Sequence, residues 1–252
     1  MNKRKSVKVS PRFIMTLILA VLLTGAGAAL AATADVGMIT GLTGKVTYWN
    51  QAEEGQPAPV QAFMKVRLGD KFKLPGNAVL KVLYFDTGRQ ETWTGPVLVT
   101  AGAGAGEAAG GGKPAVKMLP TKLTGKLKAA PLPLPRSNFQ FAGVIRTMNG
   151  QCQTQRREPV VCPSPEKARR EIAYAHRAYR KWRQKAEATD FTPEMYLLSV
   201  LAEYGRYREM DRLIIQMRGA KPGDPALKQL QVWVQKQMAA ASRKPAGSPG
   251  QE

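Results

Sequence analysis

The hydrophobic pattern of the chain changes its period partway along. Between residues 36 and 99, apolar positions alternate with polar ones or form short runs, and glycine-containing turns separate them. Gly41–Trp49 alternates, whereas Ala78–Phe85 is apolar on both faces except at Lys81. Alternation is typical of a strand exposed on one side, and a short continuous run is typical of a strand buried on both sides. Short strands with frequent turns predict an all-β sandwich or barrel for this part.

From residue 164 onward the apolar residues follow a helical period. Ser164-Pro165 and Thr192-Pro193 are typical helix starts, in which a capping residue precedes a proline of the first turn. Two more helices are expected, one starting at Tyr207 and one after Asp224. The first helix carries one apolar stripe surrounded mostly by arginine and lysine, as expected of a helix that packs with one face. This stripe consists of Ile172, Ala175, Tyr179, Trp182 and Ala186.

The start of the chain predicts export. Residues 1–12 hold five basic residues and no acid, an apolar run follows, and Ala29-Leu30-Ala31 offers a cleavage site of small residues. This arrangement is typical of a bacterial secretory signal, so residues 1–31 are expected to be removed and the remainder to reach the periplasm. The alternative is an uncleaved inner-membrane anchor, because residues 13–32 are about long enough to span a bilayer.

Export changes what the charge of the chain implies. The net charge is +20, and +15 (20 − 5) remains beyond the predicted signal. In a cytosolic protein this excess would suggest nucleic acid as a partner. For an exported protein, no nucleic acid is expected, and the anionic partners are acidic envelope polymers or the membrane surface. The alternative is a solvated basic surface, because the positive charges are spread along the chain.

Composition predicts the domain boundaries. The sequence "AGAGAGEAAGGGKPAV" is of low complexity, and a basic and then proline-rich segment follows it. Residues 101–137 are therefore predicted to be a linker between a β-domain at 35–100 and a helical domain at 164–241. The other two segments are 138–163, expected to form a strand and hairpin, and 242–252, expected to be a disordered tail.

Four short motifs in the β-domain follow one another in a defined order. They are Gly44-Lys45-Val46, Gly69-Asp70, Pro75-Gly76-Asn77-Ala78 and Phe85-Asp86-Thr87-Gly88. In this order they resemble the FecR domain, a family of periplasmic β-domains first recognised in the regulation of iron-citrate transport. The resemblance covers residues 36–99 and implies a domain that receives a partner. Three features depart from the family pattern. Thr87 is inserted in the usual Asp-Gly, and the glycine- and alanine-rich segment after residue 100 interrupts the expected continuation. Only twelve residues precede the apolar run, so the family's sigma-factor-binding domain is not expected.

The helical part contains one stretch, residues 196–225, that is similar to a tetratricopeptide repeat. The matching positions are Leu197, Leu201, Gly205, Tyr207, Ile214 and Pro222. Leu198 and Met210 depart from it, because the repeat usually has small residues at these two positions. The resemblance implies a small helical stack that binds a protein, and the alternative is a plain helical bundle, since one repeat cannot bury its own face.

The candidate chemistry of the chain is sparse. Cys152 and Cys162 are the only cysteines, and export predicts that they form a disulfide across a hairpin. His176 is the only histidine, so we expect neither a zinc site nor a Ser-His-Asp arrangement. Asp70 and Asp86 suggest a carboxylate pair for glycan hydrolysis, but an aspartate beside a turn glycine more often caps its own backbone. We therefore expect no catalytic, metal-binding or cofactor-binding residue.

These features together favour a non-enzymatic, exported interaction or signalling module of the cell envelope. Its expected fold is a FecR-like β sandwich or barrel followed by a tetratricopeptide-like helical stack. Tyrosine and arginine are common anchors of protein interfaces, which makes Tyr204, Arg206, Arg208 and Arg212 the candidate residues for binding an envelope protein or an anionic polymer. The alternative for the tyrosine is a role in closing the helix pairs. The alternative function is a protein that binds or processes envelope glycan or peptidoglycan.

Overall fold

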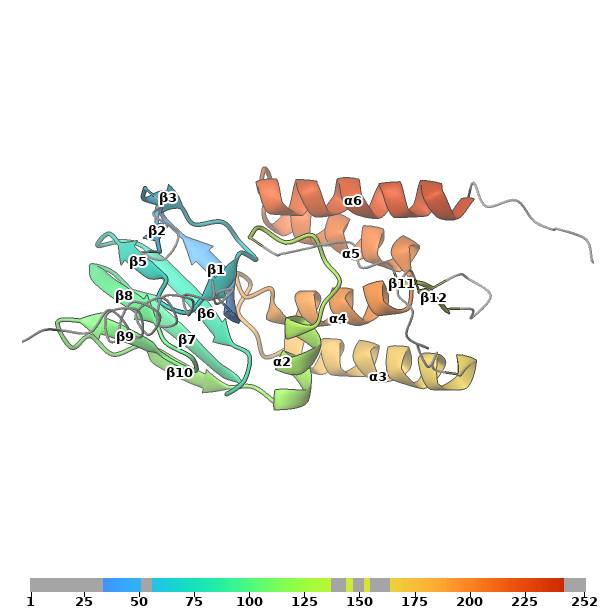
Figure 1. Ribbon diagram of the computed structural model, residues 1–252, viewed down its shortest axis with the longest axis horizontal. Helices are drawn as coiled ribbons and strands as arrows, with labels where there is room; N and C mark the ends of the chain where they lie inside the picture. The colour runs from blue at the N-terminus through green and yellow to red at the C-terminus, as the bar shows by residue number, and fades with distance from the viewer. Residues whose placement is uncertain (1–33, 51–55, 137–143, 147–151, 155–163, 243–252) are drawn as a thin grey trace, which may run out of the picture. The chain divides into compact units, whose positions relative to one another are not determined.

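The computed structural model describes residues 34–50, 56–136, 144–146, 152–154 and 164–242. The strands between Asp35 and Met118 precede the helices between Pro165 and Ser242, and Figure 1 shows them in blue to green and in yellow to red, respectively. Within the described part of the chain, one short helix and two short strands lie between them in the sequence. The described residues from Asp35 onward belong to one compact unit. Among the described residues, no helix combines the length and the apolar character needed to cross a bilayer. The predicted signal at 1–31 and residues 243–252 of the predicted tail lie outside the described residues.

Two antiparallel sheets of five strands each make up the β part. The first sheet has the order β10-β7-β6-β1-β4, and the second has the order β3-β2-β5-β8-β9. The strands of the first sheet are β1 (Asp35–Thr43), β4 (Lys65–Arg67), β6 (Val79–Tyr84), β7 (Arg89–Thr94) and β10 (Ala115–Met118). Those of the second are β2 (Thr47–Trp49), β3 (Ala58–Pro59), β5 (Lys71–Leu74), β8 (Val97–Ala101) and β9 (Gly106–Ala109).

The sheets face each other across an apolar core. Side chains of both sheets meet there, among them Ile39, Phe72, Val82, Trp93 and Val99. The predicted strand at 78–85 is confirmed as β6, the middle strand of its sheet, and it is buried on both faces as its apolar run predicted. One of its faces contributes to this core, and the other contributes Leu83 to a second core shared with the helices.

The Asp-Thr-Gly turn predicted after β6 is present and joins β6 to β7. Gly88 has a φ of +69°, a conformation that side chains disfavour. A Cβ atom at this position would also approach the carbonyl oxygen of Leu119 to 2.3 Å, and the amide of Leu119 donates to the carbonyl of Gly88 at 2.8 Å. Glycine is therefore required here by both the turn and the neighbouring chain.

The glycine- and alanine-rich segment differs from the predicted linker. It forms β9 and β10, and α2 (Thr121–Lys128) follows directly. β9 pairs with β8, and β10 pairs with β7. The composition of the segment did not indicate these two strands, because a strand held by backbone hydrogen bonds to its neighbours needs few large side chains of its own.

The helices begin where the sequence predicted. They are α3 (Pro165–Arg183), α4 (Thr192–Glu203), α5 (Tyr207–Ala220) and α6 (Pro225–Ser242). The Ser164 hydroxyl accepts from the amide of Lys167 at 3.3 Å and caps α3, and Asp224 Oδ1 accepts from the amide of Ala226 at 3.0 Å at the start of α6. Gly205, with a φ of +63°, lies between α4 and α5.

The second core joins the helices to the first sheet. Every residue of α4 from Thr192 to Ala202 is buried, since α2, α3 and α5 all contact this helix. Met38 and Phe85 of the β part belong to the same apolar cluster as Leu123 of α2 and Leu198 of α4. The succession of β part and helical part agrees with the predicted fold class, but the two parts share a core instead of forming separate domains.

The predicted strand and hairpin at 138–163 are described only in part. β11 (Val144–Arg146) and β12 (Cys152–Thr154) pair antiparallel. Cys162 lies outside the described residues. The disulfide between Cys152 and Cys162 therefore stays a prediction.

Candidate functional site

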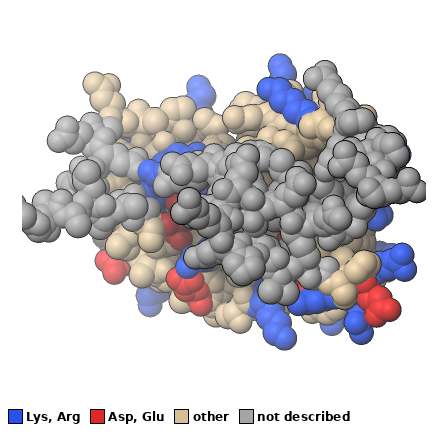
Figure 2. All heavy atoms as spheres, turned by 45° about the vertical axis from the view of Figure 1, so that its right-hand side comes forward, with Lys and Arg blue, Asp and Glu red and all other residues tan. Residues whose placement is uncertain are grey.

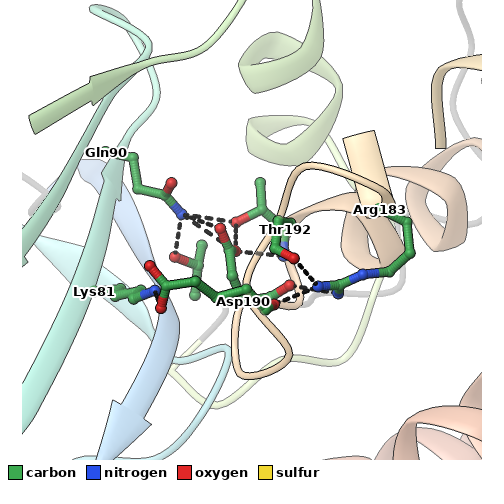
Figure 3. A network of polar contacts seen from close by, with 8 residues as sticks. Lys81, Gln90, Arg183, Asp190 and Thr192 are labelled. Atoms are coloured by element: carbon green, nitrogen blue, oxygen red, sulfur yellow. Dashed lines mark hydrogen bonds and ion pairs between the residues drawn. The ribbon is translucent and has the colours of Figure 1, made fainter. Parts of the chain in front are cut away.

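A buried polar network lies between the first sheet and the start of α4 (Figure 3). The side-chain amide of Gln90, on β7, donates to the hydroxyl of Thr40 at 3.0 Å and to the carboxylate of Asp190 at 3.3 Å. The hydroxyl of Thr192 lies 3.0 Å from the same amide and donates to Asp190 at 2.6 Å. All four side chains belong to buried residues. The network therefore satisfies polar groups that the shared core would otherwise leave unpaired.

Arg183, at the end of α3, extends this network to the loop before α4 (Figure 3). Its guanidinium donates to the carbonyl of Asp190 at 2.7 Å and to the carboxylate of Glu194 at 3.0 Å. Burial raises the pKa of Glu194 above its usual value, although the neighbouring Arg183 opposes this shift. Lys81 of β6 forms a 2.6 Å ion pair with Glu187 of the same loop. These contacts fix the loop against the sheet, which is a structural role.

Asp70, one of the two candidate carboxylates, is fully buried. It accepts from the amide of Arg67 at 2.8 Å, so it caps its own turn as the structural alternative predicted. Its carboxylate also accepts from Asn50 at 2.7 Å and from both terminal nitrogens of Arg136, at 2.6 and 3.2 Å. Asp86 instead forms an exposed 2.7 Å ion pair with Lys128. Each of the two carboxylates thus has partners of its own, and these contacts give both of them a structural role.

A third carboxylate, Glu91, lies fully buried in the sandwich. It forms a 2.5 Å ion pair with Arg89 and accepts from the indole of Trp93 and the amide of Gly106, both at 3.0 Å. Burial, followed by the charge of Glu91, raises the pKa of Tyr84 well above its usual value. Sequence analysis missed this cluster, although the alternation of Arg89, Glu91 and Trp93 along one strand places all three on the same face.

The predicted partner-binding residues divide into two pairs. The hydroxyl of Tyr204 donates to Glu171 at 2.6 Å, and Arg206 donates to Glu209 at 2.6 Å. Tyr204 therefore helps to join α4 to α3, as the alternative for the tyrosine predicted, whereas the pair of Arg206 and Glu209 lies within the first turn of α5. Arg208 and Arg212 are exposed on α5, and no hydrogen bond or ion pair joins their side chains to other described residues.

A hydrogen-bonded seam joins α3 to α5. His176 Nε2 lies 3.1 Å from Glu209 Oε2. Tyr207 of α5 packs against the second core, which the helices share with the first sheet. Burial opposes ionisation of Glu209, but hydrogen bonds from Arg206 and His176 outweigh it and hold the pKa of this carboxyl below its usual value. The acid of the seam is thus kept charged and engaged.

Exposed cations also lie on the two helices that this seam joins. We call them the basic face, and it consists of Arg169, Arg177, Arg180 and Lys181 of α3 together with Arg208 and Arg212 of α5. No ion pair or hydrogen bond holds these side chains to other residues that the structure describes. Two large side chains of the same helices are also exposed: Tyr174 of α3 is 58% exposed and Ile215 of α5 is 53% exposed. In the view of Figure 2, blue Lys and Arg groups predominate over red Asp and Glu groups.

Metal ligation receives no support from the described part of the chain, where no group of three potential ligands occurs. His176, the only histidine, is engaged with Glu209. The networks around Asp190, Asp70 and Glu91 are buried. The basic face, in contrast, consists of exposed charged side chains.

Comparison with family models, with curated proteins and with solved structures finds no match to this chain.

Proposed function

We propose that this protein is an exported, non-enzymatic interaction module of the cell envelope, and that its basic face binds phosphate-bearing anionic surfaces. The observation that carries the proposal is the set of exposed cations on α3 and α5 that form no ion pair with other described residues, together with two exposed large side chains of the same helices. Within the same helices, the nearby acids Glu171 and Glu209 are engaged in contacts between helices. The field outside the basic face is therefore positive.

Arginine suits such a partner chemically. Its guanidinium presents several donors in a fixed fork that matches phosphate, and it stays charged at any physiological pH. Each Lys or Arg close to an anionic membrane surface contributes about 1 kcal/mol of attraction. Tyr174 adds an amphipathic ring of the kind found at membrane–water interfaces. Several such groups on two adjacent helices suffice for reversible attachment.

The remaining features support an envelope location and a structural β part. The secretory pattern of residues 1–31 and the resemblance to the FecR domain both favour the periplasm. We propose that the sandwich is a FecR-like domain and that α4 and α5 are the pair similar to a tetratricopeptide repeat. The turn residues Gly69, Asp70 and Gly88 then shape the domain, as their conformations and contacts indicate.

The proposal is tested by measuring binding of the purified chain to three kinds of particle. These are neutral phosphatidylcholine vesicles, vesicles with an anionic phospholipid, and lipopolysaccharide. Binding should exceed that to neutral vesicles and fall steeply with salt, because exposed charges are screened over about 8 Å at physiological ionic strength. The two anionic particles distinguish a lipid headgroup from a lipopolysaccharide phosphate as the preferred source. Equal binding to neutral and anionic particles would contradict the proposal and favour a protein partner.

A further inference from the structure

β10 is an exposed edge strand. All four of its residues, Ala115–Met118, are exposed, and Val116 and Met118 are 43% and 63% exposed although both are apolar. Within the described part of the chain β10 pairs with β7 alone, and Figure 1 shows it at the edge of its sheet. Edge strands present unpaired backbone groups that can accept a further strand.

The register shows which backbone groups face outward. The amide of Leu119 donates to the carbonyl of Gly88 at 2.8 Å, which continues the pairing of β10 with β7. In an antiparallel pair, the residues alternate between those that hydrogen-bond to the partner and those that do not. The backbone amides and carbonyls of Ala115 and Lys117 therefore face β7, whereas those of Val116 and Met118 face the open side.

A small pocket lies beside this edge. Its volume is 160 Å³, close to the roughly 150 Å³ of an engineered apolar cavity that holds benzene. The lining is mostly apolar, with two lysines and the engaged Asp190 among its members. The lining residues include Lys117, Leu119, Leu123, Trp182, Lys185 and Pro193. The pocket therefore suits one apolar side chain of a segment that runs along β10.

Charge decides what kind of segment fits. Lys117 and Lys185 line the pocket, and Lys113 and Lys122 are exposed just before and just after β10. If two copies of the chain paired through antiparallel β10 strands by the outward groups of Val116 and Met118, Lys117 would lie directly opposite Lys117 of the second copy. Like charges in directly opposite positions are destabilising. The same lysines attract a segment that carries carboxylates.

We propose that β10 binds an extended acidic peptide from a partner protein by strand addition. The main chain of the peptide pairs with the outward groups of Val116 and Met118. One of its apolar side chains enters the pocket beside Trp182, and its carboxylates lie against Lys117 and Lys185. Main-chain pairing supplies affinity in this mode of recognition, and the pocket and the charges supply specificity.

The first test uses a synthetic fluorescent peptide of alternating Glu and Val residues with one central Leu. Saturable binding to the full chain is expected, and methylating alternate peptide amides should weaken it by about tenfold or more, because two or three main-chain hydrogen bonds are lost. Replacing Glu by Lys should abolish binding. Equal affinity for the methylated peptide or for the lysine peptide would overturn the proposal.

The second test uses variants of the chain. Val116→Pro removes an outward-facing donor and leaves the β7 side of β10 intact. Lys117→Glu reverses the charge, and Lys73→Glu, an exposed lysine on β5, is its matched control. The first two variants should lose peptide binding at an unchanged melting temperature, and the control should keep it. A concentration-dependent dimer that Val116→Pro dissociates would overturn the proposal in favour of self-pairing. Full peptide binding by both Val116→Pro and Lys117→Glu would also overturn it.

Discussion

Asp70 and Asp86 follow or precede turn glycines in similar sequence contexts, yet their surroundings differ. Asp70 is buried with Arg136 and Asn50, whereas Asp86 is exposed beside Lys128. Removing one partner of a buried ion pair leaves the other charge uncompensated and typically costs about 3–5 kcal/mol. An exposed pair contributes about 0–1 kcal/mol.

Replacing each aspartate by asparagine should therefore give different losses of stability. Asp70→Asn is expected to lower the free energy of unfolding by about 3 kcal/mol, and Asp86→Asn by less than about 1 kcal/mol. Urea denaturation of both variants measures the two values. Similar losses for the two would contradict the buried pairing of Asp70 with Arg136.

Lys65 is a buried cation whose pKa gives a prediction about pH. Its ammonium donates to the carbonyl of Leu127 at 3.2 Å and lies 4.6 Å from the ring centre of Phe85. Burial lowers the pKa of Lys65 from 10.5 to about 8. Between these two pH values the unfolded chain binds more protons at this site than the folded chain, so stability rises with pH.

The stability of the natural chain, relative to a Lys65→Met variant, should accordingly increase as pH rises from about 8 to about 10.5. The expected gain is of the order of 3 kcal/mol, since one pKa unit corresponds to about 1.4 kcal/mol. Below about pH 8 the difference should be constant. Urea denaturation of both proteins at pH 7, 9 and 10.5 tests this, and a difference independent of pH would show that Lys65 stays protonated throughout.

Residue patterns identified part of the candidate site. Arg208 and Arg212 fall outside the apolar stripe of α5, so their exposure could be predicted. The engagement of Tyr204 could not, because its partner Glu171 lies 33 residues away on another helix. The network of Gln90 with Asp190 spans 100 residues, and no local pattern indicates such a pair.

At the scale of elements, helix starts and turn glycines were readable because they depend on neighbours along the chain. Ser164-Pro165 and Asp86-Thr87-Gly88 are such signals. β9 was not readable, because its small side chains lack an apolar alternation and its pairing with β8 is a tertiary contact. Small residues at this place reflect close packing and not flexibility.

Gly106 of β9 provides a test of that explanation. A Cβ atom there would lie 2.9 Å from Glu91 and from Val99 and 3.0 Å from Tyr84. Gly106→Ala should therefore destabilise the protein by about 1–3 kcal/mol, as overpacking of a core does. Gly112→Ala is the control, since its nearest contacts would be an ordinary 3.6 and 3.7 Å. A Gly106→Ala variant as stable as the control would show that this segment is loosely packed.

At the scale of the whole molecule, the two parts share one apolar cluster and a buried polar network. Phe85 of the β part and Leu198 of α4 belong to the same cluster, and Gln90 joins the sheet to Asp190. Composition suggested two separate domains. The shared core could not be predicted, because a linear sequence shows neither the burial of α4 by neighbouring elements nor the pairing of β9 with β8. The order of strands before helices was nevertheless predictable from the change of period.

A shared core predicts cooperative unfolding. The slowest-exchanging amides of β6 and of α4 should open with the same free energy in native-state hydrogen exchange, because neither element keeps its core without the other. If the amides of α4 exchanged through a much cheaper opening than those of β6, the helices would be an independent unit.

The central claim, that the basic face binds phosphate-bearing surfaces, is tested most directly by two variants matched in charge. One replaces Arg169, Arg177, Arg208 and Arg212 by serine. The other replaces four exposed lysines outside the face, Lys45, Lys73, Lys228 and Lys236, by serine. Both keep residues 1–33, so any contribution of that segment to binding cancels.

The measurement is the dissociation constant of each full-length variant for vesicles that contain an anionic phospholipid, at fixed salt. At about 1 kcal/mol for each basic residue near the surface, loss of the four arginines should weaken binding by on the order of 100-fold or more. The lysine variant should bind nearly as well as the natural chain. Equal weakening of the two variants would show that binding follows net charge alone, and undiminished binding by the arginine variant would exclude the basic face as the site.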